Sequence, residues 1–167
     1  MNTETLLTEV EKVFIPINKP SGFAISSHKV GCDLCEYLRK DLEVYSDRLL
    51  PSEAIRYIYG EMSCLSAKGW RWVLPSYLHH CLTADSTTDH DQATEFLIYN
   101  LGPDLKYQKE TMQRLSLLNE KQINCLIHFL EWCAQHAYWS TYCPENINKG
   151  LAFMRTLGRN QSVQTDR

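Results

Sequence analysis

One stretch of the sequence, from Asn119 to Ala137, limits the fold more than any other. At about 100° per residue, its polar side chains fall in one stripe roughly 100° wide, and nearly all the others are apolar. Such a wide apolar arc is typical of a helix that several neighbours cover. Asn119 and Gln122 also have the spacing of a capping box, which marks a helix start. We therefore expect a mainly α fold, a multi-helix orthogonal bundle around a central helix at about residues 119–137.

Apolar residues at helical spacing, together with capping and breaking residues, predict further helices on both sides of this one. Leu34 and Leu38 lie on the apolar face expected for the second helix of the chain. Before that helix, Phe23 and Ile25 alternate with small residues, which suggests one short strand. The predicted helices cover about residues 3–14, 33–45, 52–59, 66–73, 75–82, 94–101 and 144–158.

No repeat and no linker divides the chain. Its 167 residues, 44% of them hydrophobic, suffice for one sizeable core, and we predict a single helical domain over residues 1–158. Gly158 is expected to close the last helix. The following residues, 159–167, include one apolar side chain and are predicted to form a disordered tail.

The charge balance bears on partners and location. The formal net charge is −3, whereas a nucleic-acid groove or an anionic membrane calls for a basic face. No segment has the apolar length of a membrane span, and the acidic N-terminal residues do not resemble a signal peptide. We therefore expect a cytoplasmic protein that binds neither nucleic acid nor membrane. In the cytosol its seven cysteines would be reduced thiols.

The strongest candidate for chemistry is the pattern His-x-x-x-Cys-x-x-Cys formed by His28, Cys32 and Cys35. Two thiolates at this spacing can bind one zinc ion, and the upstream histidine can supply a third ligand. A structural zinc site takes four ligands, and the chain has no second Cys-x-x-Cys pair. The fourth would come from a scattered residue such as Cys64, Cys81 or Cys143. The alternative is that the two thiols only pack near a helix start; a redox pair is disfavoured because it opens a helix after a strand.

Other cysteines and histidines form weaker patterns in the predicted central helix. Cys125 and His128 are one turn apart, and so are Cys133 and His136. The two pairs lie about 12 Å apart along the helix axis and cannot share an ion. We interpret them as packed thiols and solvated histidines.

The most polar internal segment, residues 83–92, is interpreted as an exposed loop. Its carboxylates, Asp85, Asp89 and Asp91, lack the glycine and the spaced oxygen ligands of a calcium loop. Elsewhere the chain has none of the short motifs that mark serine hydrolases, phosphate-binding loops, dinucleotide-binding folds or zinc proteases. A non-enzymatic role is therefore favoured.

Three stretches between about residues 60 and 135 share a pattern of aromatic, aliphatic and turn residues with a known family. They are Leu65-Ser66 followed by Trp70-Arg71-Trp72-Val73-Leu74-Pro75-Ser76-Tyr77-Leu78, then Phe96 to Pro103, and then Gln122 with Phe129, Leu130, Glu131 and Trp132. In these stretches the chain resembles an uncharacterised bacterial family of small helical proteins, a domain of unknown function. The shared positions are mostly core and turn residues, so the resemblance implies a helical fold and carries over no functional residue.

These observations favour a non-enzymatic protein-interaction module, such as an immunity or antitoxin-like factor that neutralises another protein. Such a module needs no cofactor, and acidic residues would steer a basic partner towards it. The acidic candidates are Asp41 and Glu43 together with Asp85, Asp89 and Asp91 of the loop. The alternative is a zinc-binding protein, structural or hydrolytic, that uses His28, Cys32 and Cys35.

Overall fold

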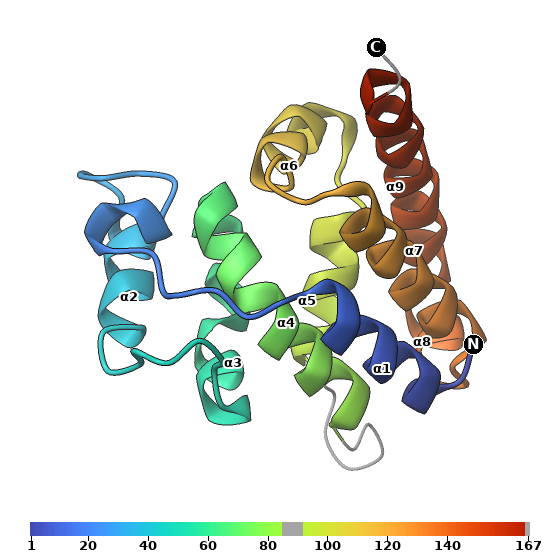
Figure 1. Ribbon diagram of the computed structural model, residues 1–167, viewed down its shortest axis with the longest axis horizontal. Coiled ribbons are helices and arrows are strands. Elements are labelled where there is room, and N and C mark those ends of the chain that lie inside the picture. Colours follow the sequence, from blue (N-terminus) through green and yellow to red (C-terminus); the bar gives the residue numbers. More distant parts are fainter. Residues whose placement is uncertain (85–91, 166–167) are drawn as a thin grey trace.

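The computed structural model describes residues 1–84 and 92–165, with side chains described as far as Arg159 (Figure 1). Over these residues the chain forms nine α-helices and three short 3₁₀ helices, and its β-type pairing is limited to an isolated antiparallel bridge between Ser26 and Leu65. The predicted mainly α fold is confirmed. No helix in the described part of the chain has the length and apolarity that crossing a membrane requires. The elements are α1 (Thr3–Val13), η1 (Gly22–Ile25), α2 (Asp33–Asp41), α3 (Ser52–Ile58), η2 (Tyr59–Cys64), α4 (Ala67–Thr83), α5 (Gln92–Leu101), η3 (Leu105–Tyr107), α6 (Gln108–Arg114), α7 (Glu120–Gln135), α8 (Trp139–Tyr142) and α9 (Pro144–Thr165).

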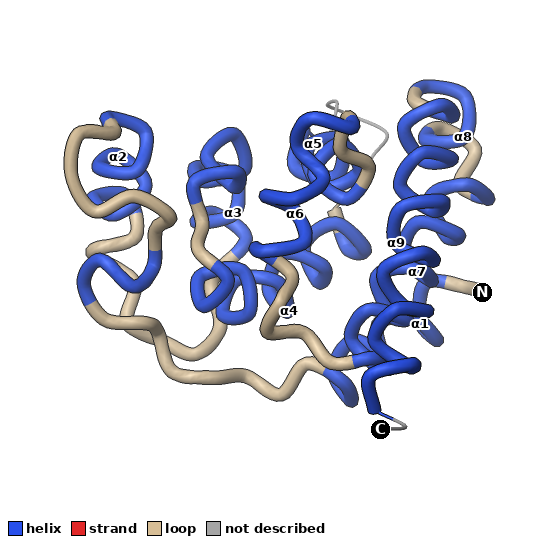
Figure 2. The backbone as a smooth tube through the Cα atoms, turned by 90° about the horizontal axis from the view of Figure 1, so that it is seen from above, coloured by secondary structure: helices blue, strands red, loops and turns tan. Residues whose placement is uncertain are grey.

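The helices are arranged so that α2 and α7 lie far apart. In Figures 1 and 2 alike, α2 stands at one end of the molecule, α1, α7 and α9 are grouped at the other, and α4 lies between them. Residues 14–21 cross this distance and join α1 to η1, which packs beside α2. Cys35 of α2 and its N-cap residue Cys32 are therefore remote from the cysteines of α7.

Helix α7 has the cap and the buried face that the sequence predicts. The Asn119 side chain accepts a hydrogen bond from the Gln122 backbone N–H (3.0 Å), and the Gln122 side chain accepts one from the Asn119 backbone N–H (3.1 Å). Gln122 Nε2 also donates to the carbonyl of Val13 (3.1 Å), which joins the start of α7 to the end of α1. Most of its apolar side chains are buried where it packs against α1, α8 and α9. The helix predicted at about 119–137 is confirmed. Its predicted central position was wrong: α7 lies with α1 and α9 at one end of the molecule, and α4 lies between that group and α2.

Helix α4 is even more completely buried, and here the sequence prediction was wrong. The pattern predicts two helices divided at Pro75, but a single helix runs from Ala67 to Thr83 with Pro75 inside it. Proline cannot donate to the carbonyl four residues earlier and costs a helix about 3 kcal/mol. Twelve of the 17 residues of α4 are buried, and this burial offsets the cost of one missing hydrogen bond.

Two local predictions around α2 were also wrong. Residues 23–25 belong to the 3₁₀ helix η1, and the β-type pairing occurs one residue later, at Ser26. Leu34 was expected on the buried face of α2 but is 55% exposed, whereas Cys35 beside it is completely buried. Leu38 is buried as predicted, so the buried face of α2 is shifted only at its start, where the Cys35 thiol and not the Leu34 side chain faces the core.

Helix α9 continues beyond the end predicted at Gly158. This glycine is buried and lies in the helix, where a Cβ atom would be 3.6 Å from Ile123 and 3.9 Å from Ile127 of α7. It faces α7 at ordinary packing distance and does not end the helix. The backbone stays helical to Thr165, so α9 includes most of the predicted tail, and the disorder of residues 159–167 stays a prediction.

Candidate metal centre

The three side chains of the histidine–cysteine pattern converge in space. His28, Cys32 and Cys35 each offer one ligand atom, and these atoms all lie within 4.8 Å of one another. Cys35 Sγ is 3.5 Å from His28 Nδ1. With Zn–S bonds of about 2.3 Å and Zn–N bonds of about 2.0–2.1 Å, tetrahedral zinc places its ligand atoms roughly 3.5–3.8 Å apart. The distance between Cys35 Sγ and His28 Nδ1 already lies in this range. The other two distances between ligand atoms exceed it by at most about 1 Å.

The start of α2 positions the two thiols. Cys32 is the N-cap residue and Cys35 lies three residues further on, so the two side chains are on one side of the helix. Gly31, directly before them, has a φ of +78°, a left-handed conformation that favours glycine. This turn lets the loop bring the exposed His28 beside the buried Cys35.

Arg39, one turn after Cys35 on α2, holds the loop that carries His28. Its guanidinium donates to the carbonyls of His28 (2.9 Å) and Lys29 (3.2 Å) and to the hydroxyl of Ser26 (2.6 Å). Partners of this kind fix the orientation of metal ligands and commonly matter for affinity. Arg39 was not identified from the sequence. Its spacing of four residues from Cys35, which puts both on one helix face, is the signal that would have found it.

The end of η2 forms another side of the site. The Cys64 carbonyl accepts a hydrogen bond from the Ser27 backbone N–H (2.8 Å) and lies 3.9 Å from Cys35 Sγ. The antiparallel bridge between Ser26 and Leu65 holds the same two segments together. Of the three cysteines that the sequence offered as a fourth ligand, Cys64 is therefore the one beside the site.

The thiols of the site differ in how readily they ionise. The backbone N–H of Cys35, and then its thiol, lower the pKa of Cys32. Burial, followed by the neighbouring Cys35 and Cys32, raises the pKa of Cys64 to about 12. Because zinc binds thiolates, the lowered pKa of Cys32 favours metal binding at this residue.

The acidic residues predicted to attract a basic partner are described only in part. Asp41 and Glu43 are both exposed near the end of α2. Glu43 shares a surface hollow with Lys19 and Arg39, so this surface is mixed in charge. The loop residues Asp85, Asp89 and Asp91 lie outside the described residues. A role in partner binding stays a prediction for all five.

The thiols of α7 take no part in the candidate metal centre. Burial raises the pKa of Cys125 to about 12 and that of Cys133 well above its ordinary value. His128 pairs with Glu9 of α1, its Nδ1 lying 2.9 Å from the carboxylate. Within the described ranges, His28, Cys32 and Cys35 are the one group of three with metal-ligand spacing. This arrangement agrees with the packing role predicted for the α7 thiols.

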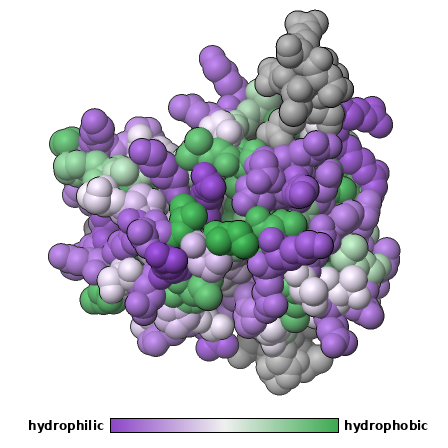
Figure 3. Space-filling model, in the orientation of Figure 1, coloured by the Kyte–Doolittle hydropathy of each residue, from purple (hydrophilic) through white to green (hydrophobic). Residues whose placement is uncertain are grey.

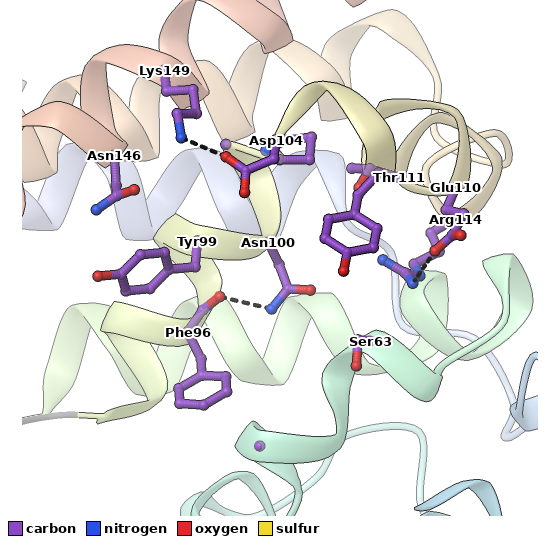
Figure 4. Close-up of a pocket in the computed structure, with 14 residues that line it drawn as sticks. Ser63, Phe96, Tyr99, Asn100, Asp104, Glu110, Thr111, Arg114, Asn146 and Lys149 are labelled. Carbon is purple, nitrogen blue, oxygen red and sulfur yellow. Dashed lines mark hydrogen bonds and ion pairs between the residues drawn. The ribbon is translucent and has the colours of Figure 1, made fainter. Parts of the chain in front are cut away.

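A second feature, a cleft between η2, α5, α6 and α9, was not identified from the sequence (Figure 4). It has a volume of about 690 Å³, and Phe96, Tyr99 and Tyr107 contribute exposed rings to its lining. Five separate elements, η3 among them, contribute residues to it, so no local sequence pattern marks it. Two ion pairs border the cleft: Lys149–Asp104 at 2.8 Å and Arg114–Glu110 at 3.4 Å.

The chain belongs to a family of unknown function, DUF6714, whose model matches residues 2–141. The resemblance to an uncharacterised family is thus confirmed, and the match extends well beyond residues 60–135 on the N-terminal side. It includes the whole candidate metal centre and ends before α9 begins at Pro144. No curated protein and no solved structure matches the chain.

Proposed function

We propose that this member of the DUF6714 family is a zinc-binding protein whose ligands include His28, Cys32 and Cys35. The observation that carries the proposal is the convergence of three ligand atoms within 4.8 Å. Two thiolates and an imidazole are the ligands that zinc prefers, whereas magnesium and calcium take oxygen ligands, which this group lacks. The lowered pKa of Cys32 supports the assignment, because zinc binding requires deprotonated sulfur.

The metal would fasten the loop at residues 26–32 to α2, at the end of the molecule remote from α7. Helix α2 has nine residues and packs on η1, α3 and η2, with Cys35 and Leu38 buried. An isolated helix of this length is unstable in water, so it depends on its contacts. Zinc binding contributes directly to folding free energy in such a region. We place the protein in the cytosol, where its thiols stay reduced and available to metal.

Elemental analysis of protein purified without added metal tests this proposal. We expect about one zinc per chain in the wild type, and none in the double variant Cys32→Ser/Cys35→Ser. Cys125→Ala is the matched control, because it removes a buried thiol of α7 and should keep the zinc. A wild-type protein without zinc would contradict the proposal, as would a double variant that keeps it. Titration of free thiols in the same samples shows whether Cys32 and Cys35 have formed a disulfide instead.

A second function, recognition of another protein, is favoured by the cleft between η2, α5, α6 and α9. Its lining combines exposed tyrosine rings with bordering charges, and tyrosine is enriched among residues that dominate binding energy at protein interfaces. Figure 3 draws the face on which α1 lies, where hydrophobic side chains gather across the middle of a mostly hydrophilic surface; this band is separate from the cleft. We propose that the protein binds a protein partner, as an immunity or antitoxin-like factor would. The carboxylates of Asp41 and Glu43, which would attract a basic partner, lie near the end of α2 and not in the cleft.

Paired variants test the cleft as the contact surface. Tyr99→Ala/Tyr107→Ala removes two rings of the cleft, while Tyr37→Ala/Tyr57→Ala removes two exposed rings elsewhere. A partner retained by the wild type and by the control pair, but lost from the cleft pair at the same salt concentration, is the expected result. Equal retention by both pairs would exclude the cleft from the interface.

A further inference from the structure

We propose that Cys64 is the fourth zinc ligand, which makes the metal centre a closed Cys₃His site joining the start of α2 to the end of η2. The inference rests on the proposed function and assigns the number of ligands, and hence the role of the metal. Structural zinc sites are closed by four protein ligands, whereas catalytic sites keep one position for water or substrate. A closed site therefore favours the structural form of the zinc hypothesis over the hydrolytic one.

Cys64 lies directly against the group of three. It is the last residue of η2 and is 8% exposed. Its carbonyl oxygen accepts a hydrogen bond from Cys35 Sγ at 3.9 Å. Cys64 is not among the three residues whose ligand atoms lie within 4.8 Å of one another. Coordination by Cys64 therefore requires its side chain to move closer to the other three ligand atoms.

The backbone around Cys64 is already fixed to the loop that carries His28. The Ser27 N–H donates to the Cys64 carbonyl (2.8 Å), and the Ser66 N–H donates to the Ile25 carbonyl (2.9 Å). The Ser27 hydroxyl also donates to the carbonyl of Leu65 (3.1 Å). These bonds set the register of residues 25–27 against residues 64–66. Because these hydrogen bonds already fix the backbone, ligand residues on it lose little conformational entropy when a metal binds.

The other two candidates for a fourth ligand lie elsewhere. Cys81, in α4, and Cys143, directly after α8, lie near Cys133 of α7 and help to raise the pKa of its thiol. Helix α7 is at the opposite end of the molecule from α2 (Figure 1). Cys64 is thus the remaining thiol that can reach the metal.

The net negative charge of a closed Cys₃His zinc site has a positive side chain beside it. Three thiolates and a neutral imidazole around Zn²⁺ carry a net charge of about −1. The Arg39 guanidinium, which donates to the carbonyl of His28, supplies a positive charge beside the site. Burial of Cys35 and Cys64 keeps water from the side of the metal that faces the core.

X-ray absorption at the zinc edge of the full chain tests the assignment without any variant. We expect three sulfur ligands and one nitrogen ligand in the wild type. In Cys64→Ser, one sulfur is expected to be replaced by oxygen. Loss of a second-shell partner alone costs about 10–100-fold in metal affinity, so loss of this direct ligand should weaken zinc binding by at least about 100-fold in competition with a chelator. Cys143→Ser is the matched control and should behave as the wild type.

The outcomes separate this inference from the proposed function. Zinc bound by only two sulfur ligands, or a Cys64→Ser variant with unchanged zinc affinity, would overturn the role of Cys64 while His28, Cys32 and Cys35 remained ligands. A wild-type protein without zinc would overturn both. The wild-type spectrum decides the ligand count even where Cys64→Ser does not fold.

Discussion

Cys35 Sγ lies 3.5 Å from Nδ1 of His28, a residue seven positions earlier that is outside the helix carrying the cysteine. This is about the separation that two ligands have on one tetrahedral zinc ion. The contact depends on three local features: the left-handed turn at Gly31, the hydrogen bonds of Arg39 to the loop, and the pairing of residues 25–27 with 64–66. The metal centre is therefore linked to the packing of η1, η2 and the start of α4.

A methyl group at Gly69 should disturb the metal centre from a distance. A Cβ atom there would lie 2.3 Å from the carbonyl oxygen of Ile25 and 3.0 Å from a Leu65 methyl carbon, so the loop would have to move away from the start of α4. We expect Gly69→Ala to cost about 1–3 kcal/mol of stability and to weaken zinc binding. Urea unfolding and chelator competition measure the two effects.

Gly60→Ala is the control for this prediction. It lies in η2, where an added Cβ would meet nothing within 4 Å and the backbone has no left-handed φ. Its stability should stay within about 0.5 kcal/mol of the wild type. Equal effects of the two substitutions would contradict the close approach of Gly69 to Ile25.

Removal of the metal should loosen one end of the molecule. We expect a zinc chelator to speed amide hydrogen exchange by at least about tenfold in residues 26–36 and 59–66, because these two segments lose the metal ion that joins them. Exchange in α7 and α9 should change little, since their mutual packing does not involve the site. Hydrogen exchange with mass spectrometry measures the segments separately. The Cys32→Ser/Cys35→Ser variant should not respond to chelator, and a uniform response along the wild-type chain would count against a local role.

The carboxyl of Glu61 should make stability depend on pH. Its Oε2 is buried and, among the described residues, has no hydrogen-bond partner; burial, and then Asp41, raise its pKa from 4.5 to about 7. Between these values the folded chain holds a proton that the unfolded chain has released, so stability falls as pH rises from about 4.5 to about 7. Glu61→Gln should therefore gain about 1–2 kcal/mol over the wild type at pH 8, allowing for partial exposure, and little near pH 4.5.

Urea unfolding of both proteins at the two pH values checks this sign. Glu53→Gln, which alters an exposed carboxylate of α3, should show no comparable gain at pH 8. A Glu61→Gln variant whose advantage is the same at both pH values would contradict the raised pKa.

The sequence predicts local features well where residues a few positions apart decide them. Asn119 and Gln122 mark the start of α7, and the capping box is present in the structure. The spacing of His28, Cys32 and Cys35 places them in one group for a similar reason, because a single turn and a helix start connect them. Both predictions needed only backbone geometry within a few residues.

Features that depend on tertiary packing could not be predicted from the sequence pattern. Proline is common at a helix start, which is why Pro75 predicted one. The helix α4 continues through Pro75 because its side chains before and after this residue are buried. Cys64 was one of three equal candidates until the pairing of Ser26 with Leu65 placed it beside Cys35. Gly158 is a residue type that commonly ends a helix, but here it lies inside α9 and packs against α7. In each case the deciding contact joins residues far apart in the chain.

Anomalous diffraction at the zinc edge, from crystals of protein purified without added metal, tests the central claim most directly. The account predicts one peak within about 2.0–2.3 Å of a ring nitrogen of His28 and of the sulfur atoms of Cys32 and Cys35. A map without a peak at this position, in a crystal whose three side chains are ordered as free groups or whose cysteines form a disulfide, would contradict it.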